Sequence, residues 1–166
     1  GAPKQLAQAR TDAQGRFSLT VPGARQGTSL YLVAQGGQSA ANKAAGNNPA
    51  IGLITVLGSK APTTVTINEM TTIATVWTHN QFINGTAIQA QPLQLKIAAG
   101  NVPSFVNLAT GGWGGAIQDP LNSGQTPTMG NFATLASVLG ACVTQVRPDA
   151  CQTVFRLGPE QLHARR

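Results

Sequence analysis

The chain has few residues that could carry out acid–base or nucleophilic chemistry. It contains five acidic residues and two histidines, His79 and His163. A hydrolase needs a nucleophile, a base within hydrogen-bonding reach and a group that orients the base. No G-x-S-x-G elbow, P-loop, dinucleotide fingerprint or H-E-x-x-H motif is present. The sequence therefore predicts no enzyme; an unfamiliar active site would require Glu69, His79 and Asp119 to meet in one pocket.

The remaining carboxylates have ordinary structural explanations. A glycosidase needs two carboxyl groups on either side of the scissile bond. Asp12 lies in a turn, Asp119 precedes a proline, Asp149 lies between the two cysteines, and Glu160 is in the basic C-terminal segment. Turns favour aspartate at such positions. Neither a calcium-loop motif nor zinc-finger spacing is found, so we expect no metal and no cofactor.

Glu69 precedes an apolar run and has a helix-capping interpretation. Thr66 and Glu69 have the T-x-x-E spacing of a capping box, in which each side chain bonds the backbone N–H of the other residue. A carboxylate there also faces the positive end of the helix dipole. The sequence favours this role over catalysis, with a cost of about 1 kcal/mol for removing either side chain.

Two cysteines, Cys142 and Cys151, flank an Arg147-Pro148-Asp149 turn. This spacing suits a local disulfide better than two free thiols. A loop of this length would contribute about 3 kcal/mol in the chain-entropy model. A disulfide indicates an oxidising compartment, so the protein is predicted to be secreted, on the cell surface or periplasmic.

Composition bounds the remaining function classes. Hydrophobic residues make up 42% of the 166 residues, enough for a packed core in one ordinary domain. Only 10% are charged, against about 25% in typical domains. The formal charge is +6, but the basic residues are scattered, so no nucleic-acid partner is expected. No apolar run is long enough for a membrane-spanning helix. The start at Gly1, without an initiator Met, suggests a mature or trimmed product.

The predicted architecture is α+β, with a β-rich front and a helical remainder. After a turn at 11–15, Phe17, Leu19 and Val21 alternate with polar residues as in a half-buried strand. A second strand is expected within 28–37. The apolar run 50–57 fits helix or strand, and the flanking Pro49 and Gly58 favour a short helix. We expect three parts: a β-module at 1–37, a connecting segment with that helix at 38–65, and a disulfide-stapled helical region at 66–166.

Helical periodicity predicts three to four helices in the last part. The first begins at Thr66, with a buried stripe of Met70, Ile73, Ala74 and Trp77, and ends near 82–85. A second spans 92–108 with a break near Gly100 and Pro103, since proline removes a helical hydrogen bond. A Gly/Pro-rich loop at 110–128 precedes helices at 129–144 and 150–157.

Trp113 lies in the motif GGWGG, between two pairs of glycines. Trp113 and Tyr31 are the candidate contacts for a sugar ring or a protein partner, because both side chains combine an apolar body with a polar tip. The alternative for Trp113, which we favour, is a loop tryptophan folded back over the helices.

"TDAQGRFSLTV" resembles the T-D-x-x-G-x-F-S-L signature of carboxypeptidase-regulatory-like (transthyretin- or Ig-type) β-sandwich modules. With "LYLVAQGG", "TVTINEMTTIATVW" and "LASVLGACV…AC", the chain is similar to secreted bacterial surface proteins in which such a module precedes a helical region with a cysteine pair. Some of them continue into NHL-type propeller repeats. The resemblance implies a non-catalytic surface or interaction role, and it transfers no catalytic residue.

This sequence departs from that family at its front, where only about ten residues precede the T-D-x-x-G turn. An incomplete sandwich has an open edge, which another chain, a second copy of this chain or the downstream helices should cover. We therefore expect a structural subunit that works through homo- or hetero-oligomeric protein assembly. The alternative is a surface module that binds carbohydrate or another extracellular ligand.

Overall fold

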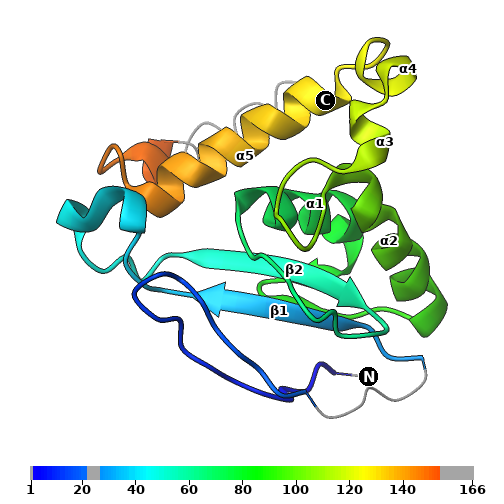
Figure 1. The fold of residues 1–166 in the computed structure, drawn as a ribbon, viewed down its shortest axis with the longest axis horizontal. Helices are drawn as coiled ribbons and strands as arrows, with labels where there is room; N and C mark the ends of the chain where they lie inside the picture. Colours follow the sequence, from blue (N-terminus) through cyan, green and yellow to red (C-terminus); the bar gives the residue numbers. More distant parts are fainter. Residues whose placement is uncertain (1, 22–26, 154–166) are drawn as a thin grey trace.

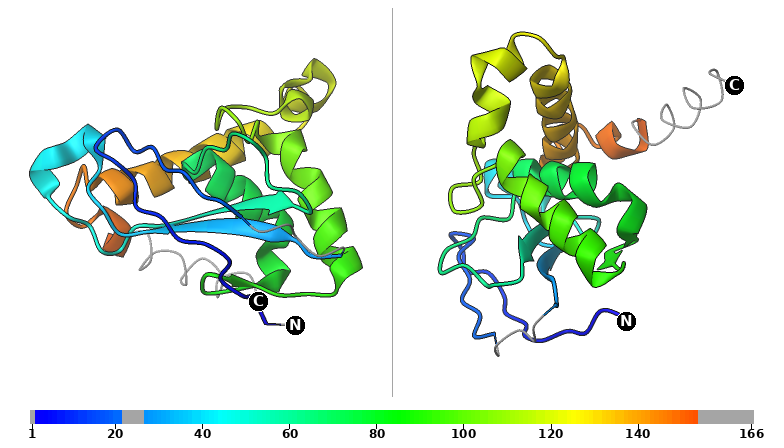
Figure 2. Two further views of the ribbon diagram at one scale, coloured as in Figure 1. Left: turned by 60° about the horizontal axis from the view of Figure 1, so that its bottom comes forward. Right: turned by 90° about the vertical axis from the view of Figure 1, so that its right-hand side faces the viewer.

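The computed structural model describes residues 2–21 and 27–153 and has a mixed α+β architecture (Figure 1). Helices α1, α2 and α5 gather on one side of a two-stranded sheet, and residues 2–21 run along the other side (Figures 1 and 2). The main elements are β1 (Leu30–Gln35), η1 (Ala40–Ala45), β2 (Gly52–Gly58), α1 (Glu69–His79), η2 (Asn80–Phe82), α2 (Pro92–Phe105) and α5 (Thr128–Thr144). The short elements are β3 (Ile83–Asn84), β4 (Ala87–Ile88), α3 (Gly115–Gln118) and α4 (Pro120–Ser123).

The sheet pairs β1 antiparallel to β2, with Val33 opposite Ile54 and Tyr31 opposite Val56. The strand expected within 28–37 is confirmed as β1. The helix expected at 50–57 is wrong, because this run forms β2. Its centre, Ile54-Thr55-Val56, is β-branched, and such residues pack well on a pleated surface and are restricted in a helix.

The predicted boundary at residue 37 therefore separates two strands of one sheet. The connection between them also bonds the end of α5, through Asn42 and Asn48. The expected three-part division thus cuts through elements that are joined by hydrogen bonds.

The predicted N-terminal strand is also wrong, although its pattern of exposure is found. The turn before it is present: the N–H of Asp12 donates to Arg16 O at 2.9 Å. Phe17, Leu19 and Val21 are then half-buried, and the residues between them are exposed. However, residues 16–21 join no ladder, because no neighbouring strand among the described residues hydrogen-bonds with them.

Most predicted helices are found with shifted limits. The helix expected from Thr66 begins at Glu69, and the one expected at 92–108 ends at Phe105 without a break. Pro103 lies in the last turn, where a missing N–H costs only one bond and few residues follow it. Within the expected loop 110–128, α3 and α4 form two four-residue helices. Of the helix expected at 150–157, residues 150–153 are helical, and the others lie outside the described residues.

The core lies between the sheet and the helices. Its buried members include Ile54 and Val56 of β2, Ala74 of α1 and Val102 of α2. Phe132 of α5 is completely buried. Its ring contacts three aromatic neighbours at centroid distances of 5.7–6.0 Å, namely Trp77, Phe105 and Trp113. The core therefore joins β2, α1, α2 and α5 into one packed unit.

A capping box does begin α1, but not at the predicted pair Thr66 and Glu69. The N-cap is Asn68: its side chain accepts from Thr71 N at 2.9 Å, and Thr71 Oγ1 accepts from Asn68 N at 3.0 Å. Thr66 instead donates its hydroxyl to Ala109 O at 2.8 Å. Asparagine is as good an N-cap as serine or aspartate, and it lies next to the helix. Glu69 is thus the first helical residue and not a member of the box.

Candidate functional site

The outer edge of β2 is covered by threonine side chains of α1. Thr72 Oγ1 accepts the backbone N–H of Ile54 at 3.1 Å, and Thr75 Oγ1 accepts that of Val56 at 3.1 Å. Between them, the hydroxyls of Thr55 and Thr71 lie 2.7 Å apart. All these threonines are buried. Side-chain hydroxyls of α1 therefore satisfy two of the backbone donors that a third strand would otherwise pair with.

These bonds also determine which groups of β1 face away from the sheet. In an antiparallel pair, directly opposite residues point their backbone groups either both inward or both outward. The N–H groups of Ile54 and Val56 point outward to α1, so their partners Val33 and Tyr31 also point outward, on the opposite edge. By the same alternation, Gln35 opposite Gly52 points outward too.

We call the outward backbone groups of Tyr31, Val33 and Gln35 the β1 edge. Within residues 2–21 and 27–153, no hydrogen bond to these groups is found. Val33 as a whole residue is 36% exposed. The β1 edge is thus a row of unpaired strand groups of the kind that accepts an additional strand.

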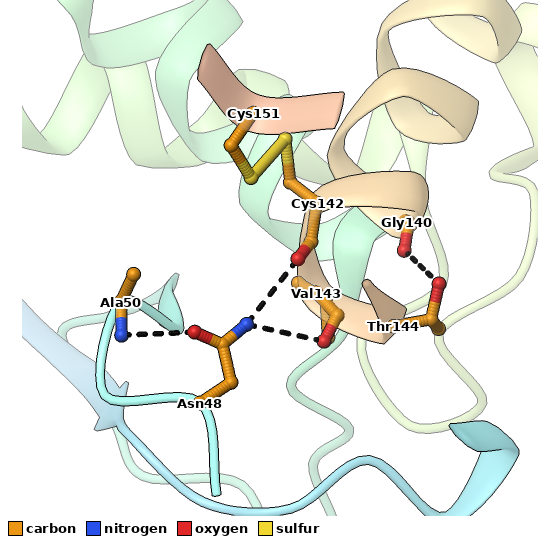
Figure 3. The surroundings of a disulfide bond; sticks show 7 residues. All are labelled: Asn48, Ala50, Gly140, Cys142, Val143, Thr144 and Cys151. Carbon is orange, nitrogen blue, oxygen red and sulfur yellow. Dashed lines mark hydrogen bonds between the residues drawn. A yellow bond between two sulfur atoms is a disulfide. The ribbon is translucent and has the colours of Figure 1, made fainter. Parts of the chain in front are cut away.

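The C-terminal end of α5 is held by two asparagines from the connection between β1 and β2. Asn42 donates its side-chain amide to Thr144 O at 2.9 Å and to Gln145 O at 3.1 Å. Asn48 donates to Cys142 O at 3.3 Å and to Val143 O at 3.4 Å (Figure 3). The last carbonyls of a helix have no intrahelical partner, and these amides supply one.

Asn48 forms hydrogen bonds through both its side-chain amide nitrogen and its side-chain oxygen. It is buried, and its Oδ1 also accepts from Ala50 N at 3.1 Å (Figure 3). Its backbone N–H donates to Gly37 O at 2.7 Å. Only a connecting segment was predicted here, since a cap that acts on a helix 94 residues later has no local pattern.

Cys142 and Cys151 lie at disulfide distance, as their spacing predicts, with Cα atoms 4.9 Å apart (Figure 3). Cα separations of about 4.4–6.8 Å are usual for disulfides. The turn between them contains an exposed ion pair of Arg147 and Asp149, 3.8 Å apart. The cysteine pair and the asparagine caps therefore fix the same end of α5.

The candidate contact residues Trp113 and Tyr31 both pack against the core. The Trp113 ring lies 5.7 Å from that of Phe132, which agrees with a loop tryptophan folded back over the helices. Tyr31 extends to β4, where its hydroxyl accepts from Ile88 N at 3.4 Å.

Two glycines of the motif around Trp113 have a packing reason. A Cβ on Gly114 would lie 2.5 Å from Pro103 O, and one on Gly111 would overlap the Asn68 side chain. Gly111 also has a φ of 72°. Its neighbours Gly112 and Gly115 have room for a Cβ. The motif is thus explained by close approach of the backbone to α2 and to the start of α1.

The three groups that an unfamiliar active site would need are not brought together. Glu69 and His79 are the first and last residues of α1, about 15 Å apart along its axis. Asp119 caps α4, where its carboxylate accepts from Leu121 N at 2.8 Å. Among the described residues, no three histidine, cysteine or acidic side chains are grouped as a metal site would require.

His79 is completely buried at the end of α1. Its Nδ1 lies 2.7 Å from Thr78 Oγ1, and its Nε2 has no hydrogen-bond partner among the described residues. Burial lowers the pKa of His79 below 6.5, and a hydrogen bond with the Thr75 backbone opposes this effect. A buried imidazole of this kind is neutral at neutral pH.

The buried face of α1 differs from the predicted stripe. Ala74 is buried as expected, but Trp77 is partly exposed, and the buried positions include Thr71, Thr72 and Thr75. A polarity-based pattern misses this face, since threonine counts as polar. The spacing i, i+1 and i+4 of three threonines is the signal that could have revealed it.

Comparison of the chain with models of known families, with curated proteins and with solved structures finds no match. No helix in the described part of the chain has the length and hydrophobicity needed to cross a bilayer.

Proposed function

We propose that the protein is a non-catalytic structural subunit of the extracellular space or cell envelope that assembles through the β1 edge. The observation that carries the proposal is the contrast between the two edges of the sheet. Thr72 and Thr75 satisfy the outward N–H groups of Ile54 and Val56 on β2, whereas those of Tyr31, Val33 and Gln35 on β1 have no partner among the described residues. Natural proteins usually cover or blunt such an edge.

The partner we propose is a second copy of this chain. Residues 16–21 alternate between half-buried apolar and exposed polar side chains, as a strand does, but they join no ladder. Within the described residues, each copy thus offers both an unpaired edge and a strand-like segment that pairs with no other strand. Pairing one with the other would satisfy backbone groups on both.

The same proposal includes the family and the compartment. The β1–β2 hairpin with residues 16–21 would be the remnant of a carboxypeptidase-regulatory-like β-module, completed between subunits. A cysteine pair at disulfide distance supports an oxidising location, either secreted, on the cell surface or periplasmic. Few charged residues, 10% of the chain, also favour close packing, because little charge needs desolvation at an interface.

The experiment compares Val33→Pro with Val33→Ala by measuring the native mass in solution. Both variants shorten a partly exposed side chain, but only proline removes the outward N–H. That N–H makes no bond within the sheet, so proline is compatible with the edge position. We expect wild type and Val33→Ala to form a defined oligomer and Val33→Pro to remain monomeric with an unchanged circular dichroism spectrum.

A monomeric wild-type protein would contradict the proposal, as would a Val33→Pro variant that assembles as well as Val33→Ala. If a different chain co-purifies with the wild type and not with Val33→Pro, the protein assembles through the β1 edge, but its partner is that chain and not a second copy.

A further inference from the structure

A groove of about 370 Å³ lies between α1 and α2, away from the β1 edge. Its lining consists of one partly exposed tryptophan, one phenylalanine and three uncharged polar residues, namely Trp77, Thr78, Asn101, Ser104 and Phe105. The groove is open to solvent, so a ligand bound in it would contact the protein on one side.

Trp77 forms a fixed aromatic wall of the groove. The residue is 38% exposed, and its ring lies 6.0 Å from the rings of both Phe105 and Phe132. Contacts with these two rings hold the indole in place from the protein side. A ligand stacking on the exposed part would therefore pay little entropy to order it.

Two polar side chains of α2 lie beside this ring. Asn101 and Ser104 are three residues apart on α2, so their side chains lie on the same face. No hydrogen bond from either side chain to another described residue is found. Each group can both donate and accept. Thr78 differs, since its hydroxyl already donates to Ala74 O at 2.8 Å.

The chemistry of the lining selects the class of ligand. None of the five residues carries a charge, so the groove offers no counter-ion to a phosphate, carboxylate or ammonium group. A purely apolar ligand would bury the amide of Asn101 and the hydroxyl of Ser104 without partners, which is unfavourable. A suitable ligand has an apolar face for the indole and neutral hydroxyls that both donate and accept.

We propose that this groove binds a neutral carbohydrate, with a pyranose ring stacked on Trp77 and its hydroxyls bonded to Asn101 and Ser104. The C–H groups on one face of a pyranose supply the apolar surface, and the ring's equatorial hydroxyls reach the two α2 side chains. Trp77 thus takes the role that the sequence suggested for Trp113.

The test titrates the full chain with neutral hexasaccharides of glucose, mannose and N-acetylglucosamine, using calorimetry and saturation-transfer NMR. We expect at least one to bind at millimolar concentration or below. Trp77→Ala should weaken binding at least about tenfold, as loss of a central aromatic contact does. Asn101→Ala, on the exposed side of α2, should weaken it about twofold to tenfold, the effect of one hydrogen bond.

Trp113→Phe is the matched control, because it removes the other tryptophan outside the groove and should retain wild-type affinity. Asn101 is exposed, so Asn101→Ala should fold normally. Weaker binding by this variant therefore reports the lost contact and not a folding defect, which Trp77→Ala could cause. The proposal is overturned if no hexasaccharide binds at millimolar concentration. It is equally overturned if Trp77→Ala and Asn101→Ala both bind as tightly as wild type.

Discussion

Replacing Thr75 with valine tests whether α1 covers the edge of β2 through hydrogen bonds. Valine has nearly the shape of threonine and is also β-branched, so the change removes the hydroxyl with little effect on packing. The N–H of Val56 then loses its acceptor, which lies 3.1 Å away in the wild type. Thr75 is 0% exposed, so water cannot replace the hydroxyl.

The expected cost follows from the burial of the orphaned donor. An unsatisfied buried donor costs about 1–3 kcal/mol, and the added methyl group recovers a fraction of this. We therefore expect Thr75→Val to lower the free energy of unfolding by about 2 kcal/mol. Thr75→Ser keeps the hydroxyl and removes one methyl group, which should cost about 1 kcal/mol.

The assay is urea unfolding without reductant, followed by circular dichroism. Thr134→Val is the matched control, because the Thr134 hydroxyl donates to Gly130 O on the exposed surface of α5. Surface changes of this kind stay within about 0.5 kcal/mol of wild type. If Thr75→Val also stays within that range, or costs less than Thr75→Ser, methyl packing and not the hydrogen bond stabilises the junction.

Three further outcomes are expected. Because burial lowers the pKa of His79, its neutral form stabilises the fold fully above about pH 6.5, and this stability is lost as pH falls through the folded-state pKa. Unfolding experiments at several pH values should show a smaller loss of stability in His79→Leu and the wild-type loss in His163→Gln. Gly114→Ala should lower the free energy of unfolding by about 1–3 kcal/mol, because the added Cβ overlaps the α2 backbone. Position 115 has room for a Cβ, so Gly115→Ala should unfold as wild type does. Asn48→Asp should lower the free energy of unfolding by about 2–4 kcal/mol, since it removes two hydrogen-bond donors and places a carboxylate at the negative end of α5. The same substitution at the exposed neighbour, Asn47→Asp, should change thermal stability little.

Features encoded over short stretches were predictable from the sequence. The turn at Asp12, the strand β1, the position of α5 and the proximity of Cys142 to Cys151 all depend on residues close together in the chain. The α+β class follows from these elements. The first residue of α1 was predicted wrongly, because Asn68 and not Thr66 is the N-cap of this helix.

Features that depend on distant partners were not predictable. The run 50–57 is a strand because β1 and α1 both bond its backbone, and an isolated apolar run cannot reveal such partners. The exposure of Trp77 and the partial burial of Trp113 depend in the same way on how α1 and the loop pack around Phe132. For the candidate site, the sequence predicted an open edge but placed a helix where β2 lies.

Two kinds of contact hold the end of α5, and they join residues at very different separations along the chain. The two contacts therefore differ in how easily they form during folding. The cysteines are nine residues apart, whereas the asparagine caps join residues 94–103 positions apart. Closing the longer loop costs about 2 kcal/mol more in chain entropy. Cys142 and Cys151 can thus meet before the rest of the chain is arranged, but the carbonyls of α5 wait for the β1–β2 connection. Oxidation of the cysteine pair therefore does not depend on formation of the β1–β2 sheet.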